Sequence, residues 1–336
     1  MNKTRVRSYI INLALVILTF VLFQVLFATG ALTSERMFTT LCINVMLAVS
    51  LNMVCGYMGQ LALGHAGFMA VGAYAGAVFT INVTAIHVLP GWLQLIMAML
   101  VGGIAAALAG ILIGIPALRL KGDYLAIMTL GFGEIIRVIF TNLGITGKGR
   151  TMSAEKLTNF PIVFWTAVIM IALIYAFIYS RHGRAVISIR DDEVTAESSG
   201  VNVTYYKVLV FAIAAGFAGV AGALWSHAYS ITPRVFDFNK SIDILIFVVL
   251  GGMGSITGSV IAASALTLLP EMLRGFDDYR MVIYALLLIV MMVFRPGGLL
   301  GKYEFSLTRA VKNAPANVGR VKAFFHGKGK RKGGAD

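Results

Sequence analysis

A glutamine and a histidine lie inside a glycine-rich hydrophobic segment, Gly56–Ala77, of this 336-residue chain. Polar side chains cost free energy at membrane depth unless they find partners. Irregular backbone there survives only when it is buried in protein or lines a water-filled path. The segment is therefore typical of a membrane protein that moves a solute, rather than of a simple anchor. Its candidate pathway residues are Gly59, Gln60, Gly64 and His65.

An acid and a base, Glu134 and Arg137, stand three residues apart in a later apolar segment. This spacing places them on one face of a helix, where they can pair. Each charge costs about 2.5–3.5 kcal/mol at membrane depth, so we expect pairing or access to water. A structural ion pair is the simpler interpretation, and a direct role in the pathway is the alternative.

The other reactive residue types predict no catalysis. His65 has no Asp, Glu, Cys or second His at ligand spacing, which favours a hydrogen-bonded structural histidine. Cys42 and Cys55 form no CxxC pair and fit small buried hydrophobic residues. The sequence shows no Ser-His-Asp arrangement, paired carboxylates or metal-ligand spacing. We therefore expect neither an enzyme nor a metal site.

Residues 181–205 form the one substantial polar loop between the apolar segments. Val186, Ile189, Glu193 and Ala196 recur at helical spacing, and Gly200 can end the helix. The pattern predicts one short helix over 184–200, which is either a solvated loop helix or a docking helix that inserts into a groove on a partner protein. The candidate docking residues are Arg190, Asp191, Asp192, Glu193, Ala196 and Gly200.

A nucleotide site is not visible in the sequence. A phosphate-binding loop needs GxxxxGK[ST], in which backbone N–H groups hold the phosphates. The run Gly144–Gly149 comes closest, but a glycine follows Lys148 and the spacing fails. If ATP drives this protein, another chain supplies the ATPase site, and we expect no cofactor in this chain.

The composition places the chain in a lipid bilayer. It is 58% hydrophobic and 13% charged, with a mean hydropathy of +0.84, whereas soluble domains carry about 25% charged residues. We predict an all-α polytopic membrane protein with about 9–10 transmembrane helices. Apolar segments of spanning length lie at 9–29, 37–55, 60–82, 91–115, 123–142, 160–180, 206–229, 241–269 and 280–295.

The distribution of basic residues fixes the expected topology. Lys3, Arg5 and Arg7 precede the first segment, which we interpret as a retained helix with a cytoplasmic start. Residues 301–336 hold nine Lys or Arg and fit a cytoplasmic tail on an anionic leaflet better than a nucleic-acid-binding tail. Nine segments would place this tail outside, so one segment is miscounted.

Two glycine-rich segments are candidates for the miscount: 56–77 and 241–269. We favour a split of the second at Gly251–Ser255 into two short helices, which gives ten elements and returns the tail to the cytoplasm. The resulting organisation is a cytoplasmic N-terminus at 1–8, one membrane domain at 9–300 and a basic cytoplasmic tail at 301–336.

Five motifs together resemble the permease subunits of bacterial branched-chain amino acid ABC importers, the LivM type in particular. The resemblance covers about residues 42–300 and leaves out the tail. The matching pieces are Gly59–Phe68 with Gly72–Tyr74, Pro116–Arg137, Gly183–Asn202, Phe217–Leu224 and Gly251–Ser255.

The resemblance implies an ABC importer permease fold in the bacterial cell membrane and one half of a translocation pore. It also implies the partners: a second, related permease, two cytoplasmic ATPase subunits that use ATP, and an extracytoplasmic solute-binding protein. The 184–200 helix would then be the coupling helix. The cargo would be leucine, isoleucine and valine.

Two alternatives remain open. The same machinery could import urea, short amides or other amino acids, since the loop Leu143–Arg150 departs from the family pattern. A secondary transporter or channel that works alone would have similar broken helices, but it would have no need of a docking helix.

Overall fold

The computed structural model describes residues 16–21, 23–25, 35–83, 90–120, 122–144, 149–273, 279–294, 297–299 and 301. The chain divides into two units, Ser34–Tyr303 and the two terminal stretches Met1–Thr33 and Glu304–Asp336. In the terminal unit, the described residues 16–21 and 23–25 are helical. The predicted N-terminal segment 1–8 and the tail beyond Gly301 lie outside the described residues.

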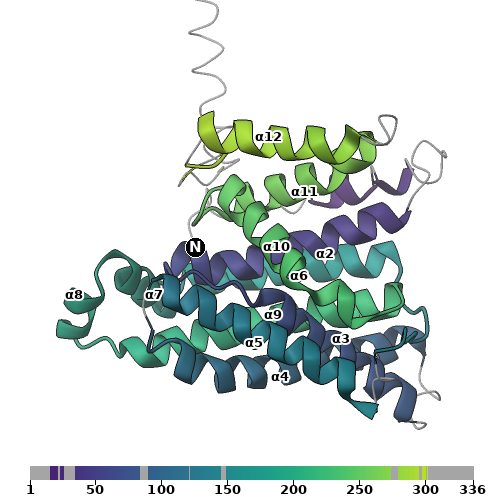
Figure 1. Cartoon of the computed structure of the whole chain (residues 1–336), viewed down its shortest axis with the longest axis horizontal. Helices are drawn as coiled ribbons and strands as arrows, with labels where there is room; N and C mark the ends of the chain where they lie inside the picture. Colours follow the sequence, from purple (N-terminus) through teal and green to yellow (C-terminus); the bar gives the residue numbers. More distant parts are fainter. Residues whose placement is uncertain are drawn as a thin grey trace, which may run out of the picture. The chain divides into compact units, whose positions relative to one another are not determined.

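The large unit is built of helices that run roughly along one direction (Figure 1). This architecture confirms the predicted all-α class. Its helices are α2 (Glu35–Asn52), π-helix η1 (Met53–Tyr57), α3 (His65–Asn82), α4 (Gly91–Ala117), α5 (Asp123–Asn142), α6 (Phe160–Ile178), α7 (Arg181–Asp191), α8 (Glu193–Ser198), α9 (Val203–Ala228), the short 3₁₀ helix η4 (Pro233–Phe236), α10 (Phe238–Gly251), α11 (Ile256–Met272) and α12 (Arg280–Phe294).

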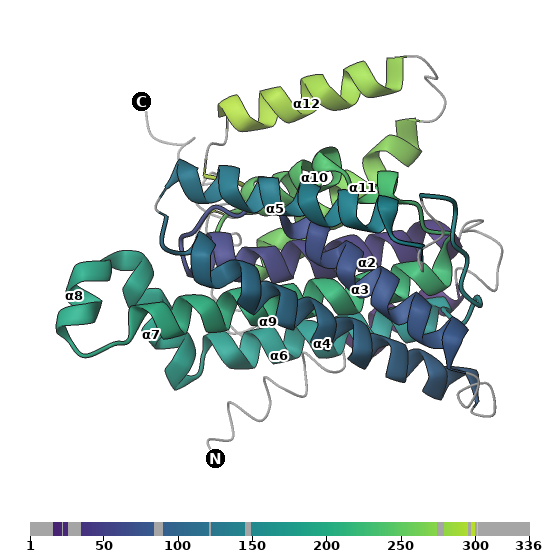
Figure 2. The same ribbon diagram turned by 60° about the horizontal axis from the view of Figure 1, so that its bottom comes forward.

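Five helices in the described part are long and apolar enough to cross a membrane: Glu35–Tyr57, α4, α5, α6 and α9. The shorter or less apolar helices α3, α10, α11 and α12 run beside them (Figure 2). Each predicted segment from 37–55 onward corresponds to one of these helices or, for 241–269, to a pair. The chain is therefore a polytopic membrane protein.

Small residues hold α3, α4 and α9 together at the centre of the unit. A Cβ atom on Gly72 of α3 would overlap the backbone of Gly219 of α9, and one on Gly222 would overlap the backbone of Met69. In lipid, where apolar burial between helices contributes little, such close backbone approach gives the packing contacts that hold helices together. Glycine at these positions is therefore a requirement of the helix packing.

Both suspected glycine-rich segments interrupt a helix. The split of 241–269 is confirmed, because α10 ends at Gly251 and α11 begins at Ile256. Gly252 and Gly254 between them have φ of 107° and 89°, a conformation that favours glycine. The other segment also breaks: η1 ends at Tyr57, and α3 begins at His65, within the predicted apolar segment 60–82.

The α7–α8 loop projects from one end of the helices in both views (Figures 1 and 2). Helix α12 ends on this same side, because a Cβ on Gly298, just beyond it, would lie 2.6 Å from Gly252 Cα. The described chain thus leaves the bundle at the end that carries the polar loop, as the split of 241–269 predicts.

Candidate translocation and coupling site

The first break, residues 58–64, begins with a widened helical turn. In η1, and just beyond it, backbone N–H groups reach back five or six residues: Met58 N donates to Met53 O over 3.1 Å and Gln60 N to Val54 O over 3.0 Å. Gly59 then adopts φ of 74° and turns the chain out of the helix. The predicted pathway residue Gln60 is half-buried in this break.

His65 opens α3 and is held by α2. Its Nε2 atom lies 2.8 Å from Ser50 Oγ in a buried hydrogen bond, and only 3% of the residue is exposed. The described residues contain no group of three His, Cys, Asp or Glu side chains that could hold a metal ion. This geometry agrees with the structural interpretation of His65.

Gly64 presses the first break directly onto α5. A Cβ on Gly64 would overlap the carbonyl oxygen of Thr129, and one on Gly67 would lie 2.9 Å from Gly133 Cα. The Thr129 hydroxyl also accepts a hydrogen bond from Leu63 N at 3.0 Å. The backbone of α5 therefore leaves no room for a side chain at Gly64.

The second break, residues 252–255, is bound to α2 by one buried amide. Asn52 Nδ2 donates to Ser255 O over 2.9 Å and to Ser259 Oγ over 3.0 Å, and Asn52 Oδ1 accepts from Gly254 N over 2.9 Å. The Asn52 side chain is completely buried. Sequence reasoning missed this residue, although a polar amide in the apolar segment 37–55 was a usable signal.

The end of η1, just before the first break, packs directly against the second break. A Cβ on Gly56 of η1 would overlap the backbone nitrogen of Gly254 and the side chain of Asn52. Residues almost 200 positions apart in sequence thus share one contact at the end of the helices that carries the α7–α8 loop.

The polar loop consists of two helices, so the prediction of one helix over 184–200 is wrong. Asp192 separates α7 from α8 with extended backbone, φ −158° and ψ 110°. Its carboxylate accepts the Thr195 hydroxyl at 2.6 Å and the N–H groups of Val194 and Thr195. These bonds, the Thr195 hydroxyl first, lower the pKa of Asp192. Gly200, with φ of 86°, follows α8 as the predicted stop.

Helix α8 is attached to the base of α9. Lys207 Nζ lies 2.8 Å from Glu193 Oε2, and the Lys207 side chain is 4% exposed while that of Glu193 is 31% exposed. A small apolar cluster lies beside this ion pair and consists of Ile189, Ala196, Val203, Val201 and Tyr206. The buried positions of Ile189 and Ala196 match the predicted apolar stripe. The loop is therefore a folded element that packs on the base of α9.

Arg190 links this element to both breaks. Its Nη1 atom donates to Gly56 O over 3.3 Å, and Nε and Nη2 bind Asp191 Oδ1 at 3.1 and 2.9 Å. A Cβ on Gly59 would lie 2.8 Å from Arg190 Cγ, and one on Gly254 would lie 3.5 Å from Arg190 Nη1. The Arg190 side chain thus lies against both breaks, with its aliphatic stem beside Gly59 and its guanidinium beside Gly254.

Glu134 and Arg137 form the predicted ion pair on α5. Arg137 Nε donates to Glu134 Oε2 over 2.7 Å, and the side chains are 34% (Glu134) and 31% (Arg137) exposed. Glu134 also lines a small cavity of about 10 Å³ with Gly67 of α3 and Asp237 at the start of α10. The predicted pathway residues therefore divide between two places: Gly59 beside Arg190, and Gly64, His65 and Glu134 around the start of α3.

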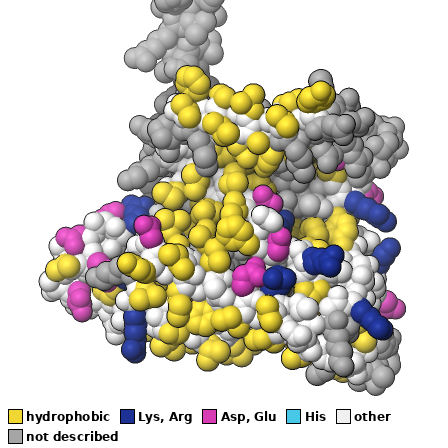
Figure 3. All heavy atoms as spheres, viewed as in Figure 1, with side chains coloured by type: hydrophobic (Ala, Val, Ile, Leu, Met, Phe, Trp, Pro, Cys, Tyr) yellow, Lys and Arg dark blue, Asp and Glu magenta, His cyan; other side chains and the backbone are white. Residues whose placement is uncertain are grey.

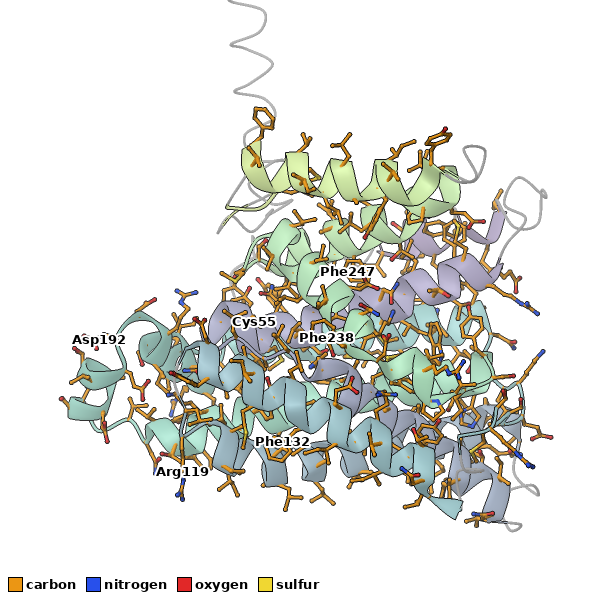
Figure 4. All side chains as sticks on the ribbon, viewed as in Figure 1. Cys55, Arg119, Phe132, Asp192, Phe238 and Phe247 are labelled. Carbon is orange, nitrogen blue, oxygen red and sulfur yellow. The ribbon has the colours of Figure 1, made fainter. Side chains whose placement is uncertain are left out.

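Figure 4 shows how far these regions are separated along the helices. Asp192 lies at the tip of the projecting loop, whereas Phe132 of α5 and Phe238 of α10 lie near the middle of the bundle's length. Glu134, two residues beyond Phe132, is thus deep between the two ends. The residues of the α7–α8 loop and the ion pair therefore lie at different positions along the helices.

Comparison with known proteins gives a family match over most of the chain. The family described as "Branched-chain amino acid transport system / permease component" matches residues 33–292. The permease protein LivM of a high-affinity branched-chain amino acid transport system from Salmonella typhimurium is 35% identical over 299 residues, which cover 78% of this chain and 68% of that protein. The corresponding LivH protein of Escherichia coli K12 is 25% identical over 283 residues, 77% of this chain and 91% of that protein.

Proposed function

Because this chain belongs to the branched-chain amino acid transport permease family, we propose that it works as one half of a shared translocation pore in an ATP-driven importer for leucine, isoleucine and valine. The other half is a second, related permease. Two ATPase subunits bind the α7–α8 element, and a solute-binding protein delivers the amino acid at the opposite end. The chain itself carries no ATPase chemistry in this proposal.

The observation that carries the proposal is the position of Arg190 between the α7–α8 element and both breaks. A folded element that projects from the membrane helices is suited to insert into a groove on a partner. Its attachment through Glu193 and Lys207 makes it move as a unit with the base of α9. Motion imposed by an ATPase would then reach α2, α3, α10 and α11 through the breaks.

The proposal fixes an orientation. The end with the α7–α8 element faces the cytoplasm of a bacterial cell, and both chain termini lie on that side. The loop charges Arg181, Arg184 and Arg190 follow the positive-inside tendency and support this side. The opposite end, which carries Met152 paired with Ile231, faces the binding protein.

Transport by the complete assembly tests the function. This chain, the second permease, both ATPases and the binding protein are reconstituted in liposomes, and uptake of radiolabelled leucine is measured. We expect uptake that requires both ATP and the binding protein and that excess isoleucine or valine inhibits. Uptake of urea or amides in place of leucine would show that the importer carries that solute and not branched-chain amino acids. Leucine uptake driven by an ion gradient without the ATPases would contradict the proposal.

Photo-crosslinking tests the docking element separately. A photoreactive residue at Val194 of α8 is compared with one at Tyr279, which precedes α12 at the opposite end; both side chains are 71% exposed. We expect Val194 to give an adduct with an ATPase subunit and Tyr279 to give none. An ATPase adduct from Tyr279 alone would reverse the proposed orientation.

A further inference from the structure

Three long helices, α4, α5 and α6, leave most of their apolar surface open within this chain. Of the most apolar 18-residue window, 28% is buried in α4, 22% in α5 and 28% in α6. Helices α4 and α6 contain no Asp, Glu, Lys or Arg. Helix α5 contains Glu134 and Arg137 well inside its length. The open faces therefore differ in charge and not in extent.

Contact with lipid would be energetically unfavourable for the open face of α5. The Glu134 and Arg137 side chains stay about one third exposed even after they pair. A charge near the bilayer centre costs about 2.5–3.5 kcal/mol on insertion scales and is found facing protein or water. Figure 3 shows acidic and basic side chains next to each other within a hydrophobic surface, over the region of α5 and α10.

Contact with water alone would also be energetically unfavourable, because large apolar side chains surround the ion pair. Ile127, Ile135 and Val138 of α5 are 66%, 53% and 49% exposed. Val138 lies one turn and Ile127 two turns from Glu134, on the same side of the helix. Leaving such side chains in water forgoes about 1.5–3 kcal/mol each. A protein surface that borders a polar path would cover the apolar side chains and leave the ion pair in contact with water.

We infer that this face of α5, centred on Ile135 with the Glu134–Arg137 pair at its margin, is the surface that contacts the second permease. The ion pair then lies where the joint surface meets the solute path, beside the small cavity that Glu134 and Asp237 line. The inference rests on the proposed function, since it needs a second permease.

The groove between α4, α6 and α9 provides the contrast. It has a volume of about 850 Å³ and an almost wholly apolar lining that includes Ile104, Trp165 and Val220. Among its lining side chains, the Thr166 hydroxyl donates to Ile162 O of its own helix over 2.8 Å. This surface suits lipid and supplies matched control positions.

The test places a photoreactive residue at Ile135 of α5, Leu108 of α4 or Ile169 of α6, which are 53%, 61% and 57% exposed. The complete assembly is illuminated in membranes. We expect an adduct between this chain and the second permease from Ile135, and only lipid adducts from Leu108 and Ile169. If only the Ile135 variant loses the second permease from the assembly, this result would also support the inference, because the bulky photoreactive side chain would then block the contact at that surface.

Three outcomes would overturn the inference: only lipid adducts from Ile135, permease adducts from Leu108 or Ile169 alone, or permease adducts from all three positions. These readings are independent of the Val194 adduct and of uptake. Failure of the ATPase contact or of ATP-driven uptake would therefore reject the proposed function without deciding which helix face meets the partner.

A thiol-labelling experiment checks the margin of the surface. With Cys42 and Cys55, both buried, replaced by alanine, a hydrophilic thiol reagent is added to assemblies that carry Glu134→Cys or Ile169→Cys. We expect labelling at position 134 and none at position 169. Equal labelling at the two positions, or labelling at 169 alone, would contradict a polar path beside α5.

Discussion

The two breaks differ in the elements that they pack against. The first spans residues 58–64, leaves Gly59 and Leu61 exposed and packs its far end on α5. The second spans residues 252–255 and is covered by the segment after α12, because Leu299 N donates to Leu250 O over 2.7 Å and a Cβ on Gly252 would overlap Gly301 O. Each break thus leaves one large apolar side chain exposed, Leu61 at 40% and Met253 at 48%, but the first packs on α5 and the second on the segment after α12.

This difference suggests a division of roles. The second break keeps α10 and α11 in place against α2 through Asn52. The first break connects α2 to α3, and α3 begins beside the α5 ion pair and the small cavity. In the proposed importer, the first break would form the wall of the path and the second would act as its anchor. Arg190 contacts both and would move them together.

Gly64→Leu in the first break should have the largest effect. The Thr129 carbonyl occupies the place of a Cβ, and overpacking of this kind costs about 1–3 kcal/mol. We expect leucine uptake to be lost and the purified permease to unfold at a lower temperature. Gly144→Leu is the control, since a Cβ there would meet no atom of the described residues within 4 Å. Equal melting temperatures for the two variants would contradict the packing of the first break against α5.

Asn52→Ala tests the anchor and should have the next largest effect. The change removes two hydrogen bonds to the second break and one to Ser259 of α11, and it leaves the half-buried Gly254 N–H without its acceptor, which costs about 1–3 kcal/mol. We expect reduced denaturation temperature and faster hydrogen exchange over 252–259. Asn142→Ala, whose amide bonds only its own helix, should leave both measurements unchanged. Faster exchange confined to residues 58–64 would mean that Asn52 stabilises the first break and not the second, and would contradict the prediction.

Asp192→Ala should have the smallest effect on the breaks, because Asp192 caps α8 and contacts neither of them. The hydrogen bond from the Thr195 hydroxyl is the main cause of its lowered pKa. A lowered pKa means that the ionised cap stabilises α8 above the ordinary range of an aspartate and loses this effect as the pH falls through the folded-state value. Relative to the intrinsic amide rate at each pH, hydrogen exchange over 193–198 should therefore become faster on acidification in the wild type and be equally fast at all pH values in the variant. An equal increase in hydrogen exchange over residues 252–259 would contradict the prediction that the Asp192 cap acts on α8 and not on the breaks.

Much of this fold could be predicted from hydropathy alone. The spans follow from runs of apolar residues, and the split at Gly251–Ser255 follows from its glycines together with the charge of the tail. The split of the loop helix at Asp192 was missed because Val186, Ile189 and Ala196 keep the same spacing across it. Extended backbone at a single capping residue leaves hardly any trace in such a pattern.

The candidate site could be predicted only in pieces. Arg190, Gly59 and the second break were each recognisable as unusual residues in their local sequence. Their contact depends on how α2, α7 and α10 pack, and residues more than 130 positions apart carry no local signal of it. The bonds of Asn52 could not be predicted for the same reason, since its partners lie more than 200 positions away. Glu193 was predicted as a docking residue, but its pairing with Lys207, 14 positions further on, was not.

The central claim is that Arg190 couples the α7–α8 element to both breaks, and Arg190→Gln tests it most directly in the reconstituted importer. A hydrogen bond to a charged group contributes about 1.5–3 kcal/mol, so we expect leucine transported per ATP hydrolysed to fall about tenfold or more while ATP hydrolysis continues. Arg184→Gln on the same helix, where the exposed guanidinium reaches only Tyr179 O at 3.4 Å, should keep the wild-type ratio. A wild-type ratio in Arg190→Gln, or an equal fall in both variants, would contradict the account.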